Sequence, residues 1–275
     1  MSVEAADIAT PPAVMAVPFE KLAGPYQVEC DERGLFCRLQ TDARHRGVDD
    51  LVDAAAMLAF ADFAMFVFAN HASEDRYADR RARGTETIVT ASFGADIISL
   101  PAIGEELVAR GAVTRDDHRR LLVEGMIDSD GQPLLSFHGI WVRTKLTADP
   151  IGDEFDANNA QTSSAAKDFL SLIGPLQSDG DGALSLVIEP RHCNLLGIAH
   201  GGLLLSLVAL GHRTKMPAVT LRSVTLDFYS PAHARADVAV MFSDLGTQRR
   251  ATRGRLRCGN LDIARFNANC EPQDV

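Results

Sequence analysis

Cysteine is scarce in this sequence, and the usual cofactor motifs are missing. Only five cysteines occur among 275 residues, and none forms a Cys-x-x-Cys pair. Their odd number and wide spacing argue against a disulfide framework or a zinc site, so we expect reduced thiols and a cytoplasmic protein. There is also no Gly-x-Gly-x-x-Gly, no phosphate-binding loop and no Ser-centred nucleophile elbow. We therefore expect neither a cofactor nor a metal.

Positive charge is in short supply as well. Lys and Arg number 27 against 37 Asp and Glu, which gives a formal net charge of −10. This balance disfavours nucleic acid or an anionic membrane as the main partner. Residues 1–17 lack the basic segment of a signal peptide and are expected to form a loose arm. The longest apolar run, 54–69, looks too short to span a bilayer and has Asp62 in its middle, so we expect no membrane span.

An internal repeat divides the chain. The segment 19–27 (FEKLAGPYQ) parallels 169–177 (FLSLIGPLQ), with Phe, Leu, Gly, Pro and Gln in register. Each copy leads through a turn into an alternating strand and then to a histidine, His45 in the first half and His192 in the second. We predict one unit over 18–146, a polar linker over 147–164 and a second unit over 165–272.

Both units have the same predicted order of elements. A short helix is followed by strands, a long apolar helix and further strands, and a charged segment, 71–84, extends the helix or forms a loop in the first unit only. The later strands are predicted over 87–99, 105–115, 118–128 and 132–145, and again over 218–229, 235–245, 248–258 and 261–269. This order predicts an α+β fold, with one long helix and an antiparallel sheet of about five or six strands in each unit.

The second unit contains a glycine-rich helix start. Residues 192–202 (HCNLLGIAHGG) leave a predicted strand and run directly into an apolar helix. A helix N-terminus offers unpaired N–H groups and partial positive charge, and glycines leave those donors open to a ligand. Such a site can hold an oxygen that develops negative charge. The alternative is a strand-to-helix turn whose glycines serve tight packing.

These residues resemble a known family. The pattern His-x-Asn-x-x-Gly-x-x-His-Gly-Gly followed by an apolar helix resembles the signature of hotdog-fold acyl-CoA thioesterases of the phenylacetate-degradation type, over roughly 169–270. The matching residues are His192, Asn194, Gly197, His200, Gly201 and Gly202. The resemblance implies a double hotdog, in which two tandem units form a single-chain version of a hotdog dimer. One departure is clear: where the family has an acidic residue, this half has Ala209.

The first unit supplies the missing acid. When the two histidines of the repeat are superposed, Asp62 falls under Ala209, and Asp53-Ala54-Ala55 falls under His200-Gly201-Gly202. Asp62 lies in a helix that is apolar on nearly every face, where an ionised carboxylate is costly unless it is paired or open to a wet cavity. A structural pairing with an arginine or a backbone donor is the alternative. The first half thus has the acid without the His-Gly-Gly, and the second half has the His-Gly-Gly without the acid.

The resemblance implies an acyl-CoA thioesterase with one composite site. Asp62 would act as base or nucleophile, the Gly201 and Gly202 amides would polarise the thioester carbonyl, Asn194 would orient water or thioester, and His200 would shape the loop. His45 and His192 match each other across the repeat, which indicates a structural role for both. Thr90 and Ser92 are further candidates, and the sequence does not fix the strand register that would choose between them.

The expected partners are a fatty or aromatic acyl-CoA and further copies of the chain, in a homo-oligomer paired through the sheets. A non-catalytic acyl-CoA-binding protein and a hotdog hydratase or dehydratase are the alternatives.

Overall fold

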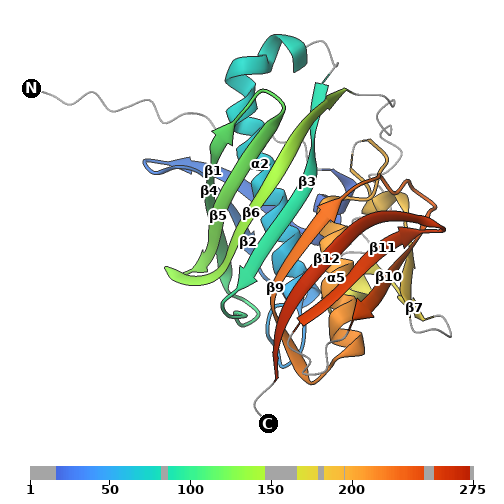
Figure 1. Ribbon diagram of the computed structural model, residues 1–275. Coiled ribbons are helices and arrows are strands. Elements are labelled where there is room, and N and C mark those ends of the chain that lie inside the picture. The colour runs from blue at the N-terminus through green and yellow to red at the C-terminus, as the bar shows by residue number, and fades with distance from the viewer. Residues whose placement is uncertain are drawn as a thin grey trace, which may run out of the picture.

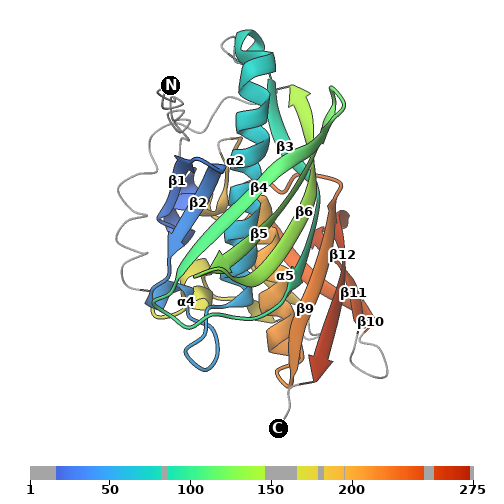
Figure 2. The ribbon, with the colours of Figure 1, turned by 90° about the vertical axis from the view of Figure 1, so that its left-hand side faces the viewer.

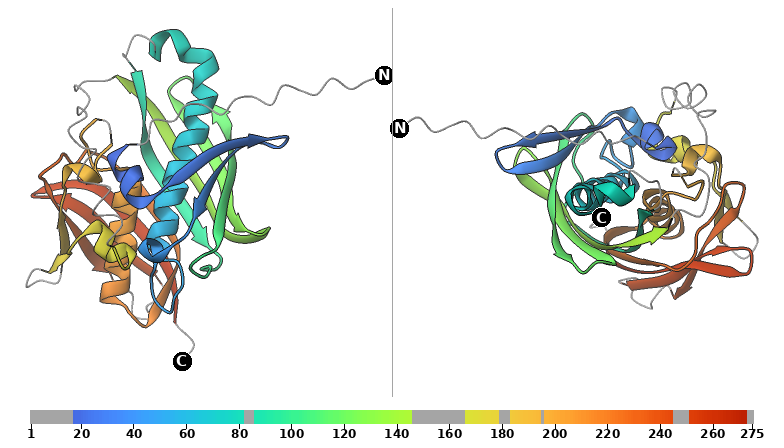
Figure 3. Two further views of the ribbon diagram at one scale, coloured as in Figure 1. Left: turned by 180° about the vertical axis from the view of Figure 1, so that it is seen from behind. Right: turned by 90° about the horizontal axis from the view of Figure 1, so that it is seen from above.

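The computed structural model (Figure 1) describes residues 17–81, 86–145, 166–178, 183–194, 196–244 and 251–272. The expected arm 1–17, apart from Val17, and the expected linker 147–164 lie outside these residues. Two long helices lie on one side of a single large antiparallel sheet, which curves around both of them (Figure 3, right).

The sheet has twelve strands in the order β1-β2-β4-β5-β6-β3-β9-β12-β11-β10-β8-β7. Strands β1 to β6 span Tyr26–Asp31, Gly34–Gln40, Glu86–Ile97, Glu106–Asp116, Arg120–Ser129 and Gln132–Lys145. Strands β7 to β12 span Gln177–Ser178, Leu184–Val187, Val219–Phe228, Asp237–Asp244, Ala251–Cys258 and Leu261–Pro272. The strands predicted for the two halves are therefore present, but they join at β3 and β9, where Gly94 pairs with Thr225.

The two long helices divide the sheet between them. Helix α2, Ala54–Arg81, packs on β2 to β6, whereas α5, Gly201–Lys215, packs on β9 and β10 (Figure 2). The charged segment after residue 70 continues α2 as far as Arg81. Two short helices, α1 at Pro18–Ala23 and α4 at Phe169–Ile173, begin the two copies of the repeat.

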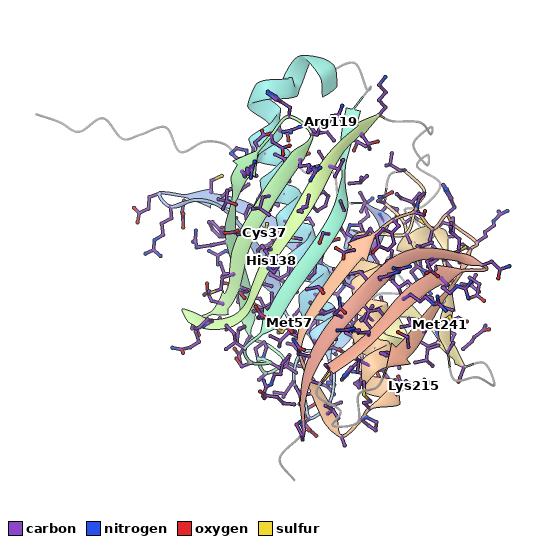
Figure 4. All side chains as sticks on the ribbon, in the orientation of Figure 1. Cys37, Met57, Arg119, His138, Lys215 and Met241 are labelled. Atoms are coloured by element: carbon purple, nitrogen blue, oxygen red, sulfur yellow. The ribbon has the colours of Figure 1, made fainter. Side chains whose placement is uncertain are left out.

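The apolar part of α2 is the centre of the core. Side chains from Ala55 to Ala69 are almost all buried, including Met57, which is labelled in Figure 4. The prediction that this run is too short to span a membrane was wrong, because the apolar part of α2 extends over 20 residues, Ala54–Ser73. By length and composition these residues could cross a membrane. However, 83% of its most apolar window is buried inside the protein, as is usual for a core helix.

Helices α2 and α5 run antiparallel and touch through small residues. A Cβ atom added at Gly202 would lie 3.1 Å from the Cα of Ala59, and the Ser206 hydroxyl donates to the carbonyl of Ala55 at 3.0 Å. Ala55 and Ala59 lie one turn apart on α2, as Gly202 and Ser206 do on α5. This close approach brings the middle of α2 to the start of α5.

A repeated cap confirms the structural role predicted for His45 and His192. Nδ1 of His45 accepts from the Asp42 N–H at 3.0 Å, and its Nε2 lies 2.9 Å from the Ala23 carbonyl at the end of α1. His192 makes the same two contacts, with the Glu189 N–H at 3.0 Å and with the Ile173 carbonyl at the end of α4 at 2.9 Å. Each buried imidazole thus fastens a short helix to the turn before a long helix.

Candidate functional site

Asp62 faces the start of α5, as the alignment of the two halves predicts. Its carboxylate is 1% exposed, and a Cβ atom added at Gly201 would lie 2.8 Å from Oδ2 and 3.1 Å from Oδ1. Only glycine at position 201 therefore lets the carboxylate approach this closely. In the described part of the chain, Oδ2 of Asp62 is buried without a hydrogen-bond partner, and no arginine or lysine forms an ion pair with this carboxylate. The alternative of a pairing with arginine is thus not what the structure shows.

His200 links the carboxylate to the helix. It is the N-cap residue of α5, and its Nδ1 lies 3.1 Å from the Gly202 nitrogen and 3.3 Å from Oδ2 of Asp62. Its Nε2 lies 3.4 Å from Oε1 of Glu20, a second buried carboxylate, contributed by α1. The ring also packs on Phe19, with 5.0 Å between the centroids. His200 therefore lies between two acidic side chains from the first half of the chain.

The surroundings shift the pKa values of both Asp62 and His200. Burial raises the pKa of Asp62, while His200, the Gly202 N–H and the Thr90 hydroxyl pull it down without cancelling the rise. For His200, burial lowers the pKa, but the hydrogen bond to Glu20 and the charges of Asp62 and Glu20 outweigh burial and raise it above 6.5. A buried acid with a raised pKa next to a helix N-terminus is typical of a functional site.

Thr90, not Ser92, is the strand residue that reaches the site. The Thr90 hydroxyl donates to Oδ1 of Asp62 at 3.2 Å, whereas the Ser92 hydroxyl donates to Asp227 at 2.9 Å on the exposed side. The pairing of β3 with β6 shifts register between these two residues, which marks a bulge at Ala91. Because a bulge reverses the alternation of side chains, two residues that would share a face point to opposite faces.

Asn194 takes part in the loop before the helix. Its Oδ1 accepts from the Leu196 N–H at 2.9 Å, and its carbonyl accepts from the Gly197 N–H at 3.0 Å. The structure thus brings together four of the five predicted residues, Asp62, His200, Gly201 and Gly202, while the contacts described for Asn194 are with its own loop.

Glu20 is the residue that sequence reasoning missed. In the sequence Glu20 looks like an ordinary acidic residue at the third position of a short helix, where such residues cap the helix. Its carboxylate does accept from the Val17 N–H at 3.0 Å. The repeat could have pointed to Glu20, because the matching position in the second copy is the apolar Leu170. Its 3% exposure was not foreseeable from a six-residue helix.

The position that the repeat relates to this site holds different residues. There Asp53 caps α2 by accepting from the Ala55 N–H at 2.9 Å, and its other oxygen pairs with Arg213 of α5. Ala209, the counterpart of Asp62, is buried and carries no polar group. An ion pair between the two helices therefore occupies the related position.

The described residues contain no group of three His, Cys, Asp or Glu side chains that could hold a metal ion.

No family model and no curated protein sequence matches the chain. Solved structures do match. An acyl-ACP thioesterase from Bacteroides thetaiotaomicron VPI-5482 has a TM-score of 0.62 at 8% identity, over 86% of this chain and 97% of that one. The 12:0-ACP thioesterase from Umbellularia californica has a TM-score of 0.59 at 13% identity, over 86% and 97%. The tesB protein from Mycobacterium avium subs paratuberculosis has a TM-score of 0.55 at 10% identity, over 94% and 98%.

The chain has the hotdog fold of acyl thioesterases. This confirms the hotdog fold that the resemblance of residues 192–202 implies, over most of the chain. At identities this low the likeness establishes the hotdog fold alone, and the activity has to be argued from the site.

Proposed function

We propose that this protein is an acyl-CoA thioesterase that acts on a fatty or aromatic acyl-CoA at a composite site. In this proposal the chain is a double hotdog, with one unit over 18–146 and the other over 165–272. The observation that carries the proposal is the contact between Asp62 of the first unit and the start of α5 in the second. The fold shared with several acyl thioesterases supports it.

The chemistry follows from this arrangement. The N–H groups in the first turn of α5 have no partner within the helix, and the Gly201 N–H would polarise the thioester carbonyl. Asp62 would take a proton from a water molecule, whose oxygen then adds to the carbonyl carbon. The carbon–sulfur bond breaks, the thiolate takes up the proton, and a free thiol and a carboxylic acid leave. Direct attack by the Asp62 carboxylate is the alternative route to the same products.

The neighbouring residues prepare Asp62 for this task. Thr90 and the Gly202 N–H stabilise its ionised form, because both lower the pKa of the carboxyl against the effect of burial. Nδ1 of His200 lies 3.3 Å from Oδ2 of Asp62, and the ring favours the ionised carboxylate when it is protonated. Asn194 would orient the water or the thioester through its amide nitrogen, since its oxygen already accepts from Leu196.

The test is a panel of acyl-CoA substrates with detection of the released thiol. We expect turnover of at least one substrate, and we expect Asp62→Asn to lower kcat by about 100-fold or more, the size typical of a lost general base. Asp53→Asn is the matched control, because it changes the related buried aspartate at the other end of the helix pair. Loss of activity in both variants, or in neither, would contradict the assignment.

Two outcomes identify the other functions. Binding of acyl-CoA without thiol release would indicate a binding protein, and addition of water to an enoyl thioester would indicate a hydratase. The homo-oligomer expected from the sequence stays a prediction, which sedimentation of the full chain would check.

A further inference from the structure

Three titratable side chains form a buried chain of contacts. Oε1 of Glu20 lies 3.4 Å from Nε2 of His200, and Nδ1 of the same ring lies 3.3 Å from Oδ2 of Asp62. The three residues are 3%, 7% and 1% exposed and come from α1, the start of α5 and α2. Elements distant in sequence thus place one imidazole between two carboxylates.

Few other charged groups face this chain. In the described part of the protein, His200 is the only cationic side chain within ion-pair distance of either carboxylate. The phenol of Tyr26, on β1, is buried without a hydrogen-bond partner among the described residues, and both carboxylates raise its pKa in addition to burial. The cluster therefore holds two acids against one base.

Both ring nitrogens of His200 face a carboxylate oxygen, and this restricts its protonation state. A neutral imidazole donates from one nitrogen only, so one of the two contacts would bring a lone pair against a carboxylate. An imidazolium carries a proton on both nitrogens, so a donor faces each carboxylate. In the neutral ring Nδ1 accepts from the Gly202 N–H at 3.1 Å; the imidazolium gives up this bond, and the amide, which also lowers the pKa of Asp62, is then left to the carboxylate.

We propose that Glu20 is a positioning residue that holds His200 as an imidazolium, and that this positive charge keeps Asp62 ionised. The second half of the statement rests on the proposed function, in which Asp62 is the base. The first half does not depend on any activity.

The electrostatic argument concerns all three groups. Glu20 favours the protonated ring directly, because an opposite charge in a buried setting stabilises the charged form. The imidazolium in turn favours the carboxylate form of Asp62, which burial alone would protonate. Glu20 also repels Asp62, but the ring lies between them and in contact with both. The three groups are therefore expected to titrate as a coupled unit.

The direct test is ¹⁵N NMR of the histidine rings in the full chain, with His200 assigned by its absence in His200→Gln. We expect both nitrogens of His200 to be protonated at neutral pH. In Glu20→Gln we expect a neutral ring, with the midpoint of titration lower by ~1 pH unit or more. Glu271→Gln is the matched control, because that carboxylate pairs with Arg222 on the surface; it should leave the midpoint unchanged.

A neutral His200 in the wild-type protein at neutral pH would overturn the proposal, even if Glu20→Gln failed to fold. An unchanged midpoint in a folded Glu20→Gln would overturn it as well.

The second readout is the pH dependence of kcat/KM. Without the imidazolium, the pKa of Asp62 rises, so we expect the acid limb of Glu20→Gln to move to higher pH by ~1 unit. A purely structural role of Glu20 would lower kcat without moving this limb, and that outcome would overturn the second half of the proposal. If no thioester is hydrolysed at all, the proposed function fails, while the NMR result still decides whether Glu20 holds the imidazolium.

Discussion

Asp53 and Arg213 form an ion pair between α2 and α5 at the position that the internal repeat relates to the contact between Asp62 and Gly201. Asp53 is 5% exposed and also caps α2. Arg213 reaches it from the last turn of α5, where a cation is favourable for the helix dipole. One end of the helix pair is thus closed by an ion pair, and the other presents an acid to a helix start.

This ion pair should matter for stability and not for turnover. We expect Arg213→Ala to lower the free energy of unfolding by about 3 kcal/mol, because it leaves the buried Asp53 without its cation. The side chain of Arg213 is 30% exposed, so water compensates part of the loss. Urea unfolding measures the change. Below the melting temperature kcat should stay within about twofold, and a large fall in kcat would assign this end of the helix pair to the site.

Substitution of the two glycines at the start of α5 should affect different properties, activity for Gly201 and stability for Gly202. In Gly201→Ala the new methyl meets both oxygens of Asp62 and the Thr90 hydroxyl, which lies at 3.2 Å, so we expect kcat to fall by about 100-fold with little change in stability. In Gly202→Ala the methyl meets the backbone of Ala59, so we expect a loss of about 1–3 kcal/mol in stability. Parallel kinetics and urea unfolding of both variants would show the contrast, and identical profiles would contradict it.

Thr90 should control the acid limb of the activity. Its hydroxyl lowers the pKa of Asp62, so Thr90→Val should raise that pKa and move the acid limb of kcat/KM to higher pH. We expect kcat/KM to fall about 10-fold, since a hydrogen bond to a charged group contributes about 1.5 kcal/mol or more. Ser92→Ala is the control, because that hydroxyl bonds Asp227 on the exposed side. Equal effects of the two substitutions would argue against a role of the bulge in aiming Thr90.

Buried histidines should make the fold sensitive to acid. Burial lowers the pKa of His192 and of His212 from 6.5 to about 4, and that of His45 in the same direction. The unfolded chain therefore binds more protons between pH 6.5 and pH 4, and stability falls as the pH falls through this range. Each full shift corresponds to about 3 kcal/mol. His200 acts oppositely, since its raised pKa stabilises the fold below pH 6.5 and this contribution is lost as the pH rises.

The measurement is urea unfolding of wild type and His192→Gln at several pH values. Glutamine can still donate to the Ile173 carbonyl but does not titrate, so the variant should lose about 3 kcal/mol less than wild type between pH 6.5 and pH 4. Parallel losses in the two proteins would show that His192 does not cause this sensitivity.

Much of the fold could be predicted because its signals are local. Strand β6 begins and ends at the predicted residues, 132 and 145, and the Asp130-Gly131 turn before it has the positive φ angles, 48° and 76°, of a tight hairpin. Most other predicted strands agree within two residues. The pairing of β3 with β9 could not be predicted from local signals, because the sequence pattern of a strand does not specify which other strand pairs with it.

The candidate site could be predicted at the positions where the two copies of the repeat can be compared. Asp62 stood out because its counterpart is Ala209 and its helix is apolar. Thr90 could not be separated from Ser92, since the bulge at Ala91 has no signature in the sequence. Glu20 and Arg213 were missed because their partners, His200 and Asp53, lie 180 and 160 residues away in the chain, and only the packing of the helices brings them together.

The junction of β3 with β9 has a consequence for inheritance as well as for architecture. A gene for two identical subunits changes both copies at once, so neither end of a symmetric helix pair can be altered without its mate. Here β3 and β9 belong to one polypeptide, and the two ends of the helix pair differ, with Asp53 and Arg213 at one end and Asp62 and Gly201 at the other. Under the proposed function, selection can therefore adjust one end for folding and the other for chemistry, with no compromise between them.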